Sequence, residues 1–126
     1  MKKKILAVDD EADIANLVKL ILEPVGFEVE AVCDPRLAYD TAKRFKPDAI
    51  LLDLLMPGLD GWEIFAKLRN DPDFCKIPIA ILTAKSQGVD KLVGLHVMKA
   101  DSYITKPFGI QELIDKTNEL FRKKTE

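Results

Sequence analysis

Residues 48–61 read Asp-Ala-Ile-Leu-Leu-Asp-Leu-Leu-Met-Pro-Gly-Leu-Asp-Gly and join a predicted buried strand to a turn. Residues 49–52 form an unbroken apolar run, which is typical of a strand that is covered on both faces. Asp53 is the first charged residue after this run. The proline and glycines that follow predict a turn before a helix that opens at Trp62. The sequence therefore places the Asp53 carboxylate at the carboxyl end of a buried strand.

This position allows two interpretations of Asp53. Open α/β sheets bind their ligands outside the carboxyl ends of the strands, which favours a functional role. A single aspartate can equally cap a turn or the helix that follows it. The choice between them depends on which residues stand at the ends of the other strands.

Four further segments have the pattern of strands, and each pattern predicts a place in the sheet. Residues 5–8 and 77–82 are apolar runs, residues 27–32 alternate apolar and acidic side chains, and residues 102–105 are short and polar. Apolar runs belong inside a sheet, whereas alternating or polar strands belong at its edges. The first run is followed by Asp9 and Asp10, the run 77–82 by Thr83, and the last segment by Lys106.

The segments between these strands carry apolar residues at helical spacing. The expected helices begin near Ile14, Pro35, Trp62, Val89 and Ile110. Asp34 is expected to cap the second of them, and Pro47 is expected to end it. Such alternation predicts a parallel sheet with right-handed crossovers and helices on both faces. The predicted fold class is α/β, a flavodoxin-like doubly wound (βα)5 sandwich with strand order 2-1-3-4-5. We expect residues 1–126 to form a single domain.

Composition excludes several classes of protein. A length of 126 residues with 48% hydrophobic residues suffices for one core without metals or disulfides. The formal charge of -2 indicates no general attraction to nucleic acid or to an anionic membrane. The N-terminal apolar run is too short for a signal peptide or a membrane span, so we expect a cytoplasmic protein. Cys33 and Cys75 match no metal-ligand spacing and are expected to be reduced.

The predicted strand order brings Asp9, Asp10 and Asp53 together, because the first and third strands are neighbours. Three close carboxylates need a cation, and all-oxygen ligands favour Mg²⁺, with Mn²⁺ as a substitute. We expect Asp10 to be a direct ligand and Asp9 to act partly through water. Asp53 would supply another oxygen, and the backbone carbonyl of Leu55 would complete the protein ligands.

The ends of the fourth and fifth strands add a hydroxyl group, Thr83, and an ammonium group, Lys106. These groups suit a phosphoryl anion beside the cation, because the total charge of the pocket with a divalent ion is near zero. Asp53 is flanked by the other groups and is the expected nucleophile, which would form an acyl phosphate. Catalysis would consist of positioning and charge neutralisation by the ion, Thr83, Lys106 and the Ala84 amide.

Motifs along the whole chain resemble the receiver domain of two-component response regulators. They are Asp9-Asp10, Asp53-x-x-Met56-Pro57-x-x-Asp60-Gly61, Thr83-Ala84 and Tyr103-x-x-Lys106-Pro107-Phe108. The resemblance implies that Asp53 takes a phosphoryl group from a sensor histidine kinase or a His-phosphotransfer protein. It also implies that Lys106 pairs with the phosphoryl group while Thr83 shifts towards it. Tyr103 would turn inward and change the surface of the fourth helix, fifth strand and fifth helix, which binds a downstream target.

The resemblance carries further expectations. It implies a cis Lys106–Pro107 bond, self-catalysed phosphotransfer rather than a separate enzyme activity, and a monomer or a weak phosphorylation-dependent dimer. Lys99 stands where a glycine often ends the fourth helix, which predicts a shifted or ragged helix end. Leu55 is apolar and cannot orient a water molecule, which predicts a long phosphoryl lifetime.

Each alternative function would differ from the receiver interpretation in one sequence feature or one property. An aspartyl phosphatase would carry a second acid where Leu55 stands, and a flavodoxin would carry Ser, Thr and Gly where this chain has Asp9 and Asp10. A non-phosphorylated interaction module of the same fold would not bind Mg²⁺. Within the receiver interpretation, the short tail after the fifth helix favours a free-standing protein over a piece of a multidomain regulator.

Overall fold

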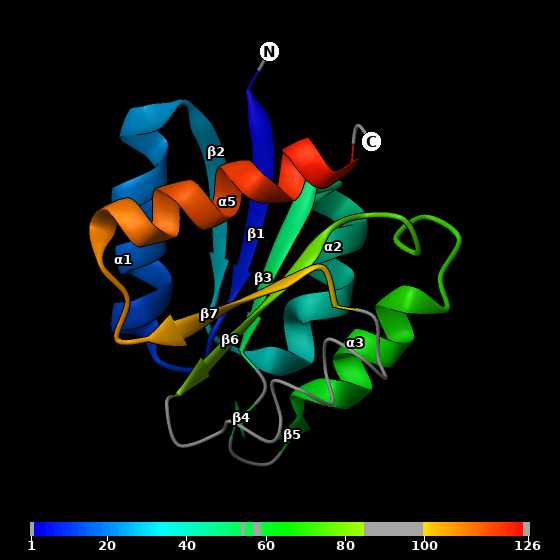
Figure 1. The fold of residues 1–126 in the computed structure, drawn as a ribbon. Coiled ribbons are helices and arrows are strands. Elements are labelled where there is room, and N and C mark those ends of the chain that lie inside the picture. The colour runs from blue at the N-terminus through cyan, green and yellow to red at the C-terminus, as the bar shows by residue number, and fades with distance from the viewer. Residues whose placement is uncertain (1, 54, 57–58, 85–99, 125–126) are drawn as a thin grey trace.

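The computed structural model describes residues 2–53, 55–56, 59–84 and 100–124. Within them, five parallel strands form one sheet in the order β2-β1-β3-β6-β7 (Figure 1). The strands are β1 Lys3–Val8, β2 Phe27–Val32, β3 Ala49–Asp53, β6 Ile79–Ala84 and β7 Ser102–Lys106. Because β6 and β7 are the fourth and fifth strands of this sheet along the chain, the predicted order 2-1-3-4-5 is confirmed.

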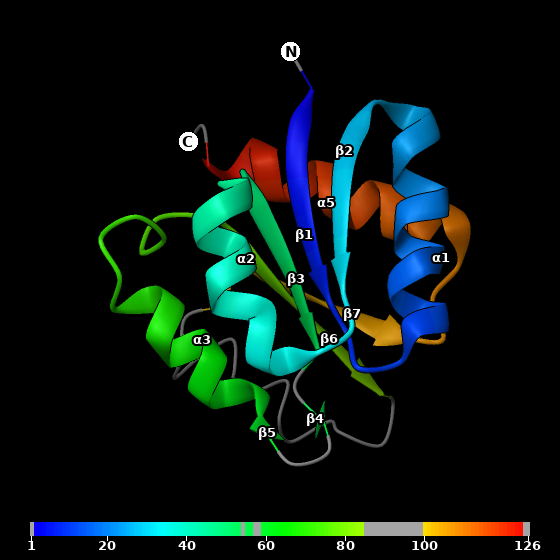
Figure 2. The same cartoon turned by 180° about the vertical axis from the view of Figure 1, so that it is seen from behind.

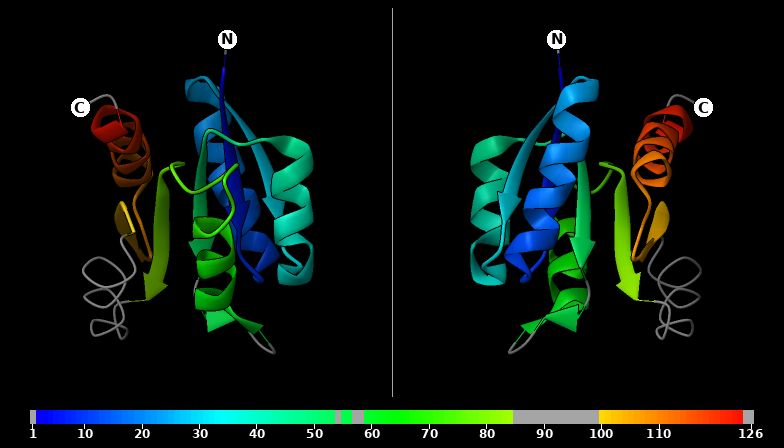
Figure 3. Two further views of the ribbon diagram at one scale, coloured as in Figure 1. Left: turned by 90° about the vertical axis from the view of Figure 1, so that its right-hand side faces the viewer. Right: turned by 90° about the vertical axis from the view of Figure 1, so that its left-hand side faces the viewer.

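Four helices of the described residues cover the two faces of the sheet. α1 Ala12–Leu22 and α5 Ile110–Lys124 pack on one face, and α2 Ala38–Phe45 and α3 Gly61–Arg69 pack on the other. Figure 2 shows α2 and α3 in front of the strands, and Figure 3 shows α2 and α5 on opposite sides of the sheet. This layered arrangement confirms the predicted flavodoxin-like fold.

Successive residues of β3 contribute to two different hydrophobic clusters. Ile50 and Leu52 pack with α2 and α3, whereas Ala49 and Leu51 pack with α1 and α5. All four side chains are fully buried, which explains why this strand reads as an unbroken apolar run. The edge strands β2 and β7 mix buried residues with exposed or half-buried ones, as their polar patterns predicted.

The ends of α1 and α2 are set by local backbone geometry. A 3₁₀ turn, η1 Glu23–Val25, follows α1, and Gly26 then takes a positive φ of 105° before β2 begins. A second turn, η2 Pro35–Leu37, precedes α2, and the side chain of Asp34 caps it, as predicted, but caps a 3₁₀ turn rather than the α-helix. α2 ends in the left-handed conformation of Lys46 (φ 56°), one residue before the proline that was predicted to end it.

β6 begins two residues later than the apolar run 77–82 predicts. Pro78 has no backbone N–H for the ladder, but its carbonyl accepts a hydrogen bond from the backbone N–H of Ile50 at 3.0 Å. The segment predicted as a turn after Asp53 includes a small antiparallel pair, β4 Leu55–Met56 and β5 Leu59–Asp60. These two-residue strands carry no hydrophobic alternation that could have predicted them.

The predicted fourth helix, near residues 89–98, lies outside the described residues, and so does Lys99. The expected irregular end of that helix therefore stays a prediction. The carboxyl ends of the described strands gather at the lower edge of the sheet in Figure 1. The residues at these ends form the candidate site.

Candidate functional site

The carboxyl ends of β1 and β3 bring three aspartates together. Asp9 directly follows β1 and Asp53 ends β3, and these neighbouring parallel strands are in register. One carboxylate oxygen from each of Asp9, Asp10 and Asp53 lies within 4.8 Å of the other two. Asp9 is 0% exposed and Asp53 is 3% exposed, while Asp10 is half-buried. The convergence that the sequence predicted is present in the structure.

Both carboxylate oxygens of Asp9 have partners. Oδ1 accepts a hydrogen bond from the backbone N–H of Glu11 at 2.9 Å, and Oδ2 accepts one from Nζ of Lys106 at 2.8 Å. A carboxylate that is held in this way is less available as a direct metal ligand than the half-buried Asp10. The indirect role expected of Asp9 stays a prediction.

Lys106 reaches the aspartates from the far edge of the sheet. It is the last residue of β7, and its side chain crosses the ends of β6 and β3 to approach β1. Nζ lies 2.8 Å from Oδ2 of Asp9 and 3.5 Å from Oδ2 of Asp53. The side chain is only 15% exposed. The predicted meeting of Lys106 with the acidic cluster is therefore observed, and its bond to Pro107 is cis, as the resemblance implies.

The environment of Lys106 keeps its ammonium group charged. Burial by itself lowers the pKa of a lysine, because it disfavours the charged form. Here the hydrogen bond to Asp9 and the negative charges of Asp53, Asp9 and Glu11 outweigh burial, so that the pKa of Lys106 is raised above its ordinary value. Lys106 thus supplies one permanent positive charge to the site.

Glu11 is the site residue that the sequence did not predict. Its Oε1 lies 3.6 Å from Nζ of Lys106, although its side chain is 63% exposed. The sequence signal was its place directly after Asp9 and Asp10. That signal was insufficient, because contact with Lys106 depends on how far a side chain from β7 reaches across the sheet.

The three aspartates fit a small hard cation. Octahedral coordination at roughly 2.1 Å separates adjacent ligand oxygens by about 3 Å and opposite ones by about 4 Å, so three oxygens that lie within 4.8 Å of one another are grouped closely enough to share an ion. All three donors are carboxylates, and oxygen donors suit Mg²⁺ or Mn²⁺. With Lys106 included, the four side chains carry a formal charge of about -2, which a divalent ion would neutralise.

Two further predicted site residues, Thr83 and Leu55, are described only by their backbone. Thr83 lies near the carboxyl end of β6, directly after the residue that pairs with Asp53. Leu55 begins β4, two residues beyond Asp53, and pairs with Asp60. The side chains of Thr83 and Leu55 lie outside the described part of the chain, so that their predicted roles stay predictions.

Tyr103 lies in the middle of β7, away from the acidic cluster. The ring is half-buried, packs at the margin of the α2–α3 core, and has Nζ of Lys116 at 5.6 Å from its centroid. The structure thus places Tyr103 on the edge strand, where an aromatic residue serves ordinary packing as well as a switch. The switch role stays a prediction.

Comparison with known proteins shows the family to which this fold belongs. The sequence model of the response regulator receiver domain matches residues 5–118. The chain belongs to this family. Receiver domains are signalling phosphoacceptors rather than classical enzymes, and they bind Mg²⁺ in an acidic pocket.

Solved structures of other receiver proteins resemble this receiver domain over nearly its full length. A response regulator from Chloroflexus aurantiacus is 30% identical, with a TM-score of 0.89 and coverage of 97% of this chain and 99% of that chain. Chemotaxis response regulator CheY4 of Vibrio cholerae is 30% identical, with a TM-score of 0.87 and coverage of 95% and 99%. The receiver domain of a histidine kinase from Syntrophus aciditrophicus is 34% identical, with a TM-score of 0.83 and coverage of 96% and 91%.

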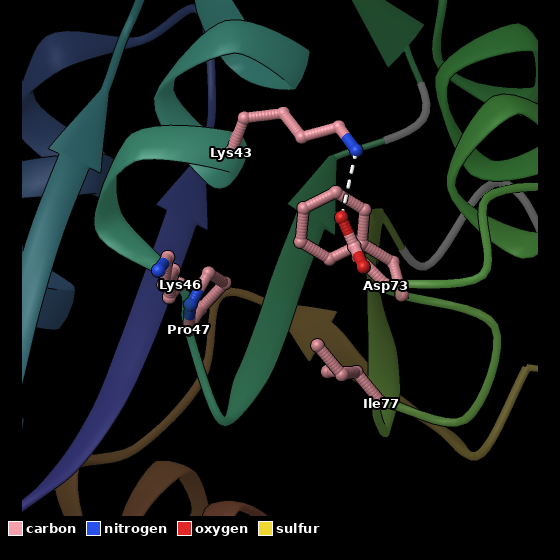
Figure 4. A pocket seen from close by; sticks show the side chains of 6 residues that line it. Lys43, Lys46, Pro47, Asp73 and Ile77 are labelled. Atoms are coloured by element: carbon pink, nitrogen blue, oxygen red, sulfur yellow. Dashed lines mark hydrogen bonds and ion pairs between the residues drawn. The ribbon is translucent and has the colours of Figure 1, made fainter.

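The receiver domain also has a hollow of about 370 Å³ at the opposite edge of the sheet. It is lined by Lys43, Lys46, Pro47, Asp73, Phe74 and Ile77. Figure 4 shows the ion pair between Lys43 and Asp73 that crosses it, with Nζ 2.9 Å from Oδ2. This hollow lies beside the amino ends of β3 and β6, whereas sheets of this type bind ligands at their carboxyl ends. We therefore place the functional site at the acidic cluster.

The helices of the described residues include none that is long and apolar enough to span a membrane.

Proposed function

We propose that Asp53 accepts a phosphoryl group from a phosphohistidine of a sensor histidine kinase or a His-phosphotransfer protein, in a reaction that depends on Mg²⁺. The observation that carries this proposal is the position of the Lys106 ammonium, 2.8 Å from Asp9 and 3.5 Å from Asp53. A lysine beside three gathered carboxylates provides for a cation and a phosphoryl anion at one place.

The proposed transfer is a displacement at phosphorus. A carboxylate oxygen of Asp53 forms a bond to the phosphorus while the bond from phosphorus to the donor imidazole nitrogen breaks. The electron pair stays on that nitrogen, which takes up a proton as neutral histidine leaves. Attack of water on the acyl phosphate later restores the carboxylate of Asp53 and releases inorganic phosphate.

Each site residue has a separate role in this proposal. Asp10, Asp53 and the backbone carbonyl of Leu55 would hold the cation, and Asp9 would act partly through water. When bound, the ion supplies positive charge to the phosphoryl oxygens. Lys106 binds one of these oxygens as an ion pair, and the Thr83 hydroxyl donates a hydrogen bond to another. The apolar Leu55 favours a long phosphoryl lifetime, because it cannot orient an attacking water.

The signal would leave the site through the edge of the sheet. Tyr103 on β7 would change its orientation when Thr83 moves, altering the surface formed by the fourth helix, β7 and α5. A downstream protein or an output domain would read this surface. We propose that the receiver domain acts as a free-standing regulator. Its resemblance to CheY4 supports this, because the match covers 99% of the CheY4 chain. The alternative is a receiver within a longer chain, as in the histidine kinase from Syntrophus aciditrophicus.

Treatment with acetyl phosphate tests the acceptor role. We expect Mg²⁺-dependent, hydroxylamine-sensitive phosphorylation of the wild type, and no phosphorylation of Asp53→Asn or of wild type in excess EDTA. Phosphorylation that persists in Asp53→Asn, or its complete absence from the wild type, contradicts the proposal. Lack of Mg²⁺ binding by calorimetry supports the non-phosphorylated interaction module instead. Phosphotransfer from candidate kinases then identifies the donor.

A further inference from the structure

Among the side chains that the structure describes, Lys106 has three carboxylate neighbours, and one of them lies outside the predicted metal cluster. Asp9 and Asp53 are nearly inaccessible, whereas the Glu11 side chain is 63% exposed and approaches Nζ from the solvent side at 3.6 Å. Glu11 is also absent from the group of carboxylates that lie close enough together to share an ion. It therefore contacts the lysine without belonging to the cation site.

The backbone of Glu11 is fixed on both sides. Its N–H donates to Oδ1 of Asp9 at 2.9 Å, and its carbonyl accepts from the backbone N–H groups of Ile14 and Ala15 at 3.0 and 3.1 Å. These bonds tie it to the buried aspartate and to the first turn of α1. The backbone bonds thus hold Glu11 beside the site, and the torsions of its exposed side chain set the distance from its carboxylate to Nζ.

Phosphoryl transfer requires Lys106 to change partners. When the oxygens of the aspartates bind a cation, their attraction for the ammonium group weakens, and Lys106 becomes free to pair with the phosphoryl group. Glu11 is the partner that keeps its full charge during this exchange. It attracts the lysine away from the phosphoryl group, and it also repels an incoming dianion.

We propose that Glu11 is a positioning residue that holds Lys106 in its resting place and thereby opposes its transfer to the phosphoryl group; this rests on the acceptor role proposed for Asp53. Glu11 would set the rate at which the site is phosphorylated without touching the reacting atoms. A partly exposed ion pair changes an equilibrium by up to about fivefold, so a modest adjustment of rate is the expected scale.

Two substitutions separate the contact from the charge. Glu11→Gln removes the charge, whereas Glu11→Asp keeps it but withdraws the carboxylate by one methylene group. We expect Glu11→Gln to raise the initial rate of phosphorylation by acetyl phosphate about two- to fivefold, and to tighten binding of beryllofluoride by a similar factor. We expect Glu11→Asp to show a large part of both gains. Mg²⁺ affinity, measured by calorimetry, should be unchanged or lower in Glu11→Gln, because a negative charge is lost. A substitution that damaged the site would instead weaken the binding of both beryllofluoride and Mg²⁺.

Asp13→Asn is the matched control, because Asp13 is an exposed acid two residues after Glu11, in the first turn of α1, and has no ion pair with Lys106 among the described residues. We expect it to change the rate less than half as much as Glu11→Gln. Equal effects of the two substitutions, or no effect of Glu11→Asp, would show that general charge repulsion acts and would overturn the positioning role.

The acceptor role is checked in the same experiment. If the wild type is phosphorylated, Asp53→Asn is not, and Glu11→Gln matches the wild type, only the role of Glu11 is refuted. If the wild type is not phosphorylated at all, the acceptor role fails and the inference about Glu11 fails with it.

Discussion

Nζ of Lys106 lies 2.8 Å from Oδ2 of Asp9, although 97 positions separate the two residues in the chain. Asp9 is fully buried, and the Lys106 side chain is 15% exposed. The pair therefore joins the second half of the fold to the end of β1, and it places a positive charge among the gathered aspartates. Without a cation, the lysine is the principal compensation for their mutual repulsion.

Replacing this lysine should destabilise the domain most where no divalent ion is present. Lys106→Met leaves the buried charge of Asp9 uncompensated, which lowers the free energy of unfolding by about 3 kcal/mol in EDTA. We expect saturating Mg²⁺ to restore a large part of this loss, because the ion supplies the missing positive charge. Urea unfolding in the two buffers measures the difference. Lys19→Met, in the last turn of α1, serves as the exposed control. An equal loss for Lys106→Met in both buffers would contradict the explanation.

A second carboxylate, Asp71, should make stability depend on acid pH. The hydrogen bond from Lys43, followed by bonds from Tyr39 and the Asp73 backbone, lowers the pKa of Asp71 to about 2. Nζ of Lys43 lies 2.8 Å from Oδ2 of Asp71. Because the pKa is lower in the folded state than in the unfolded state, the stabilisation is complete above pH of about 4 and is lost as pH falls towards 2.

We therefore expect Asp71→Asn to be less stable than the wild type at pH 7, with a difference that shrinks between pH of about 4 and 2. Urea unfolding at stepped pH values measures the two curves. In a Lys43→Met background the principal cause of the lowered pKa is gone, so the same substitution should give a much flatter difference. A difference that grows as the pH falls would show that the sign of this effect is wrong.

Two arginine pairs should differ in their effect on stability despite similar distances. Nη2 of Arg69 lies 2.8 Å from Oδ2 of Asp101, and Nη1 donates to the carbonyl of Ile77 at 2.7 Å. The Arg69 side chain is 19% exposed, whereas that of Arg36, paired with Asp34 at 3.0 Å, is 81% exposed. Arg69 thus connects the end of α3 to the residues that precede β6 and β7.

Arg69→Met should lower the free energy of unfolding by about 2 kcal/mol, because a partly buried charge-assisted network loses its donor. Arg36→Met should leave the unfolding midpoint unchanged, because water and salt compensate an exposed pair. Urea unfolding of both variants in the same buffer compares them. Equal effects would mean that burial does not decide the contribution of these pairs.

The strands and their order could be predicted because burial leaves a direct trace in the sequence. A central strand such as β3 needs apolar residues on both faces, and an edge strand does not. The acidic ends of β1 and β3 could then be placed together by topology alone. The contact of Glu11 with Lys106 could not, because side-chain reach across three strands has no counterpart in local pattern.

The ends of elements were harder to predict, for a different reason. Pro47 was expected to end α2, since proline disfavours a helical conformation in the residue before it. The structure shows that this residue, Lys46, goes further and takes a left-handed conformation with φ 56°. A lysine gives no sign of this conformation, which glycine or asparagine would have suggested. The residue type of Lys46 therefore gave no sign of its conformation, whereas Pro47 correctly indicated that the helix ends here.

This unusual conformation gives a last prediction, in which two opposite substitutions are compared. Lys46→Gly should raise the free energy of unfolding by about 0.5–1 kcal/mol, because glycine adopts a positive φ without the strain that a Cβ atom causes. Gly26→Ala should lower it by about 1 kcal/mol. An added Cβ at Gly26 meets no atom within 4 Å, so this loss would report its φ of 105° and no steric clash. Urea unfolding of both variants gives the two signs. Destabilisation by Lys46→Gly would mean that the lysine side chain, which lines the hollow beside Asp73, contributes more than its backbone strain removes.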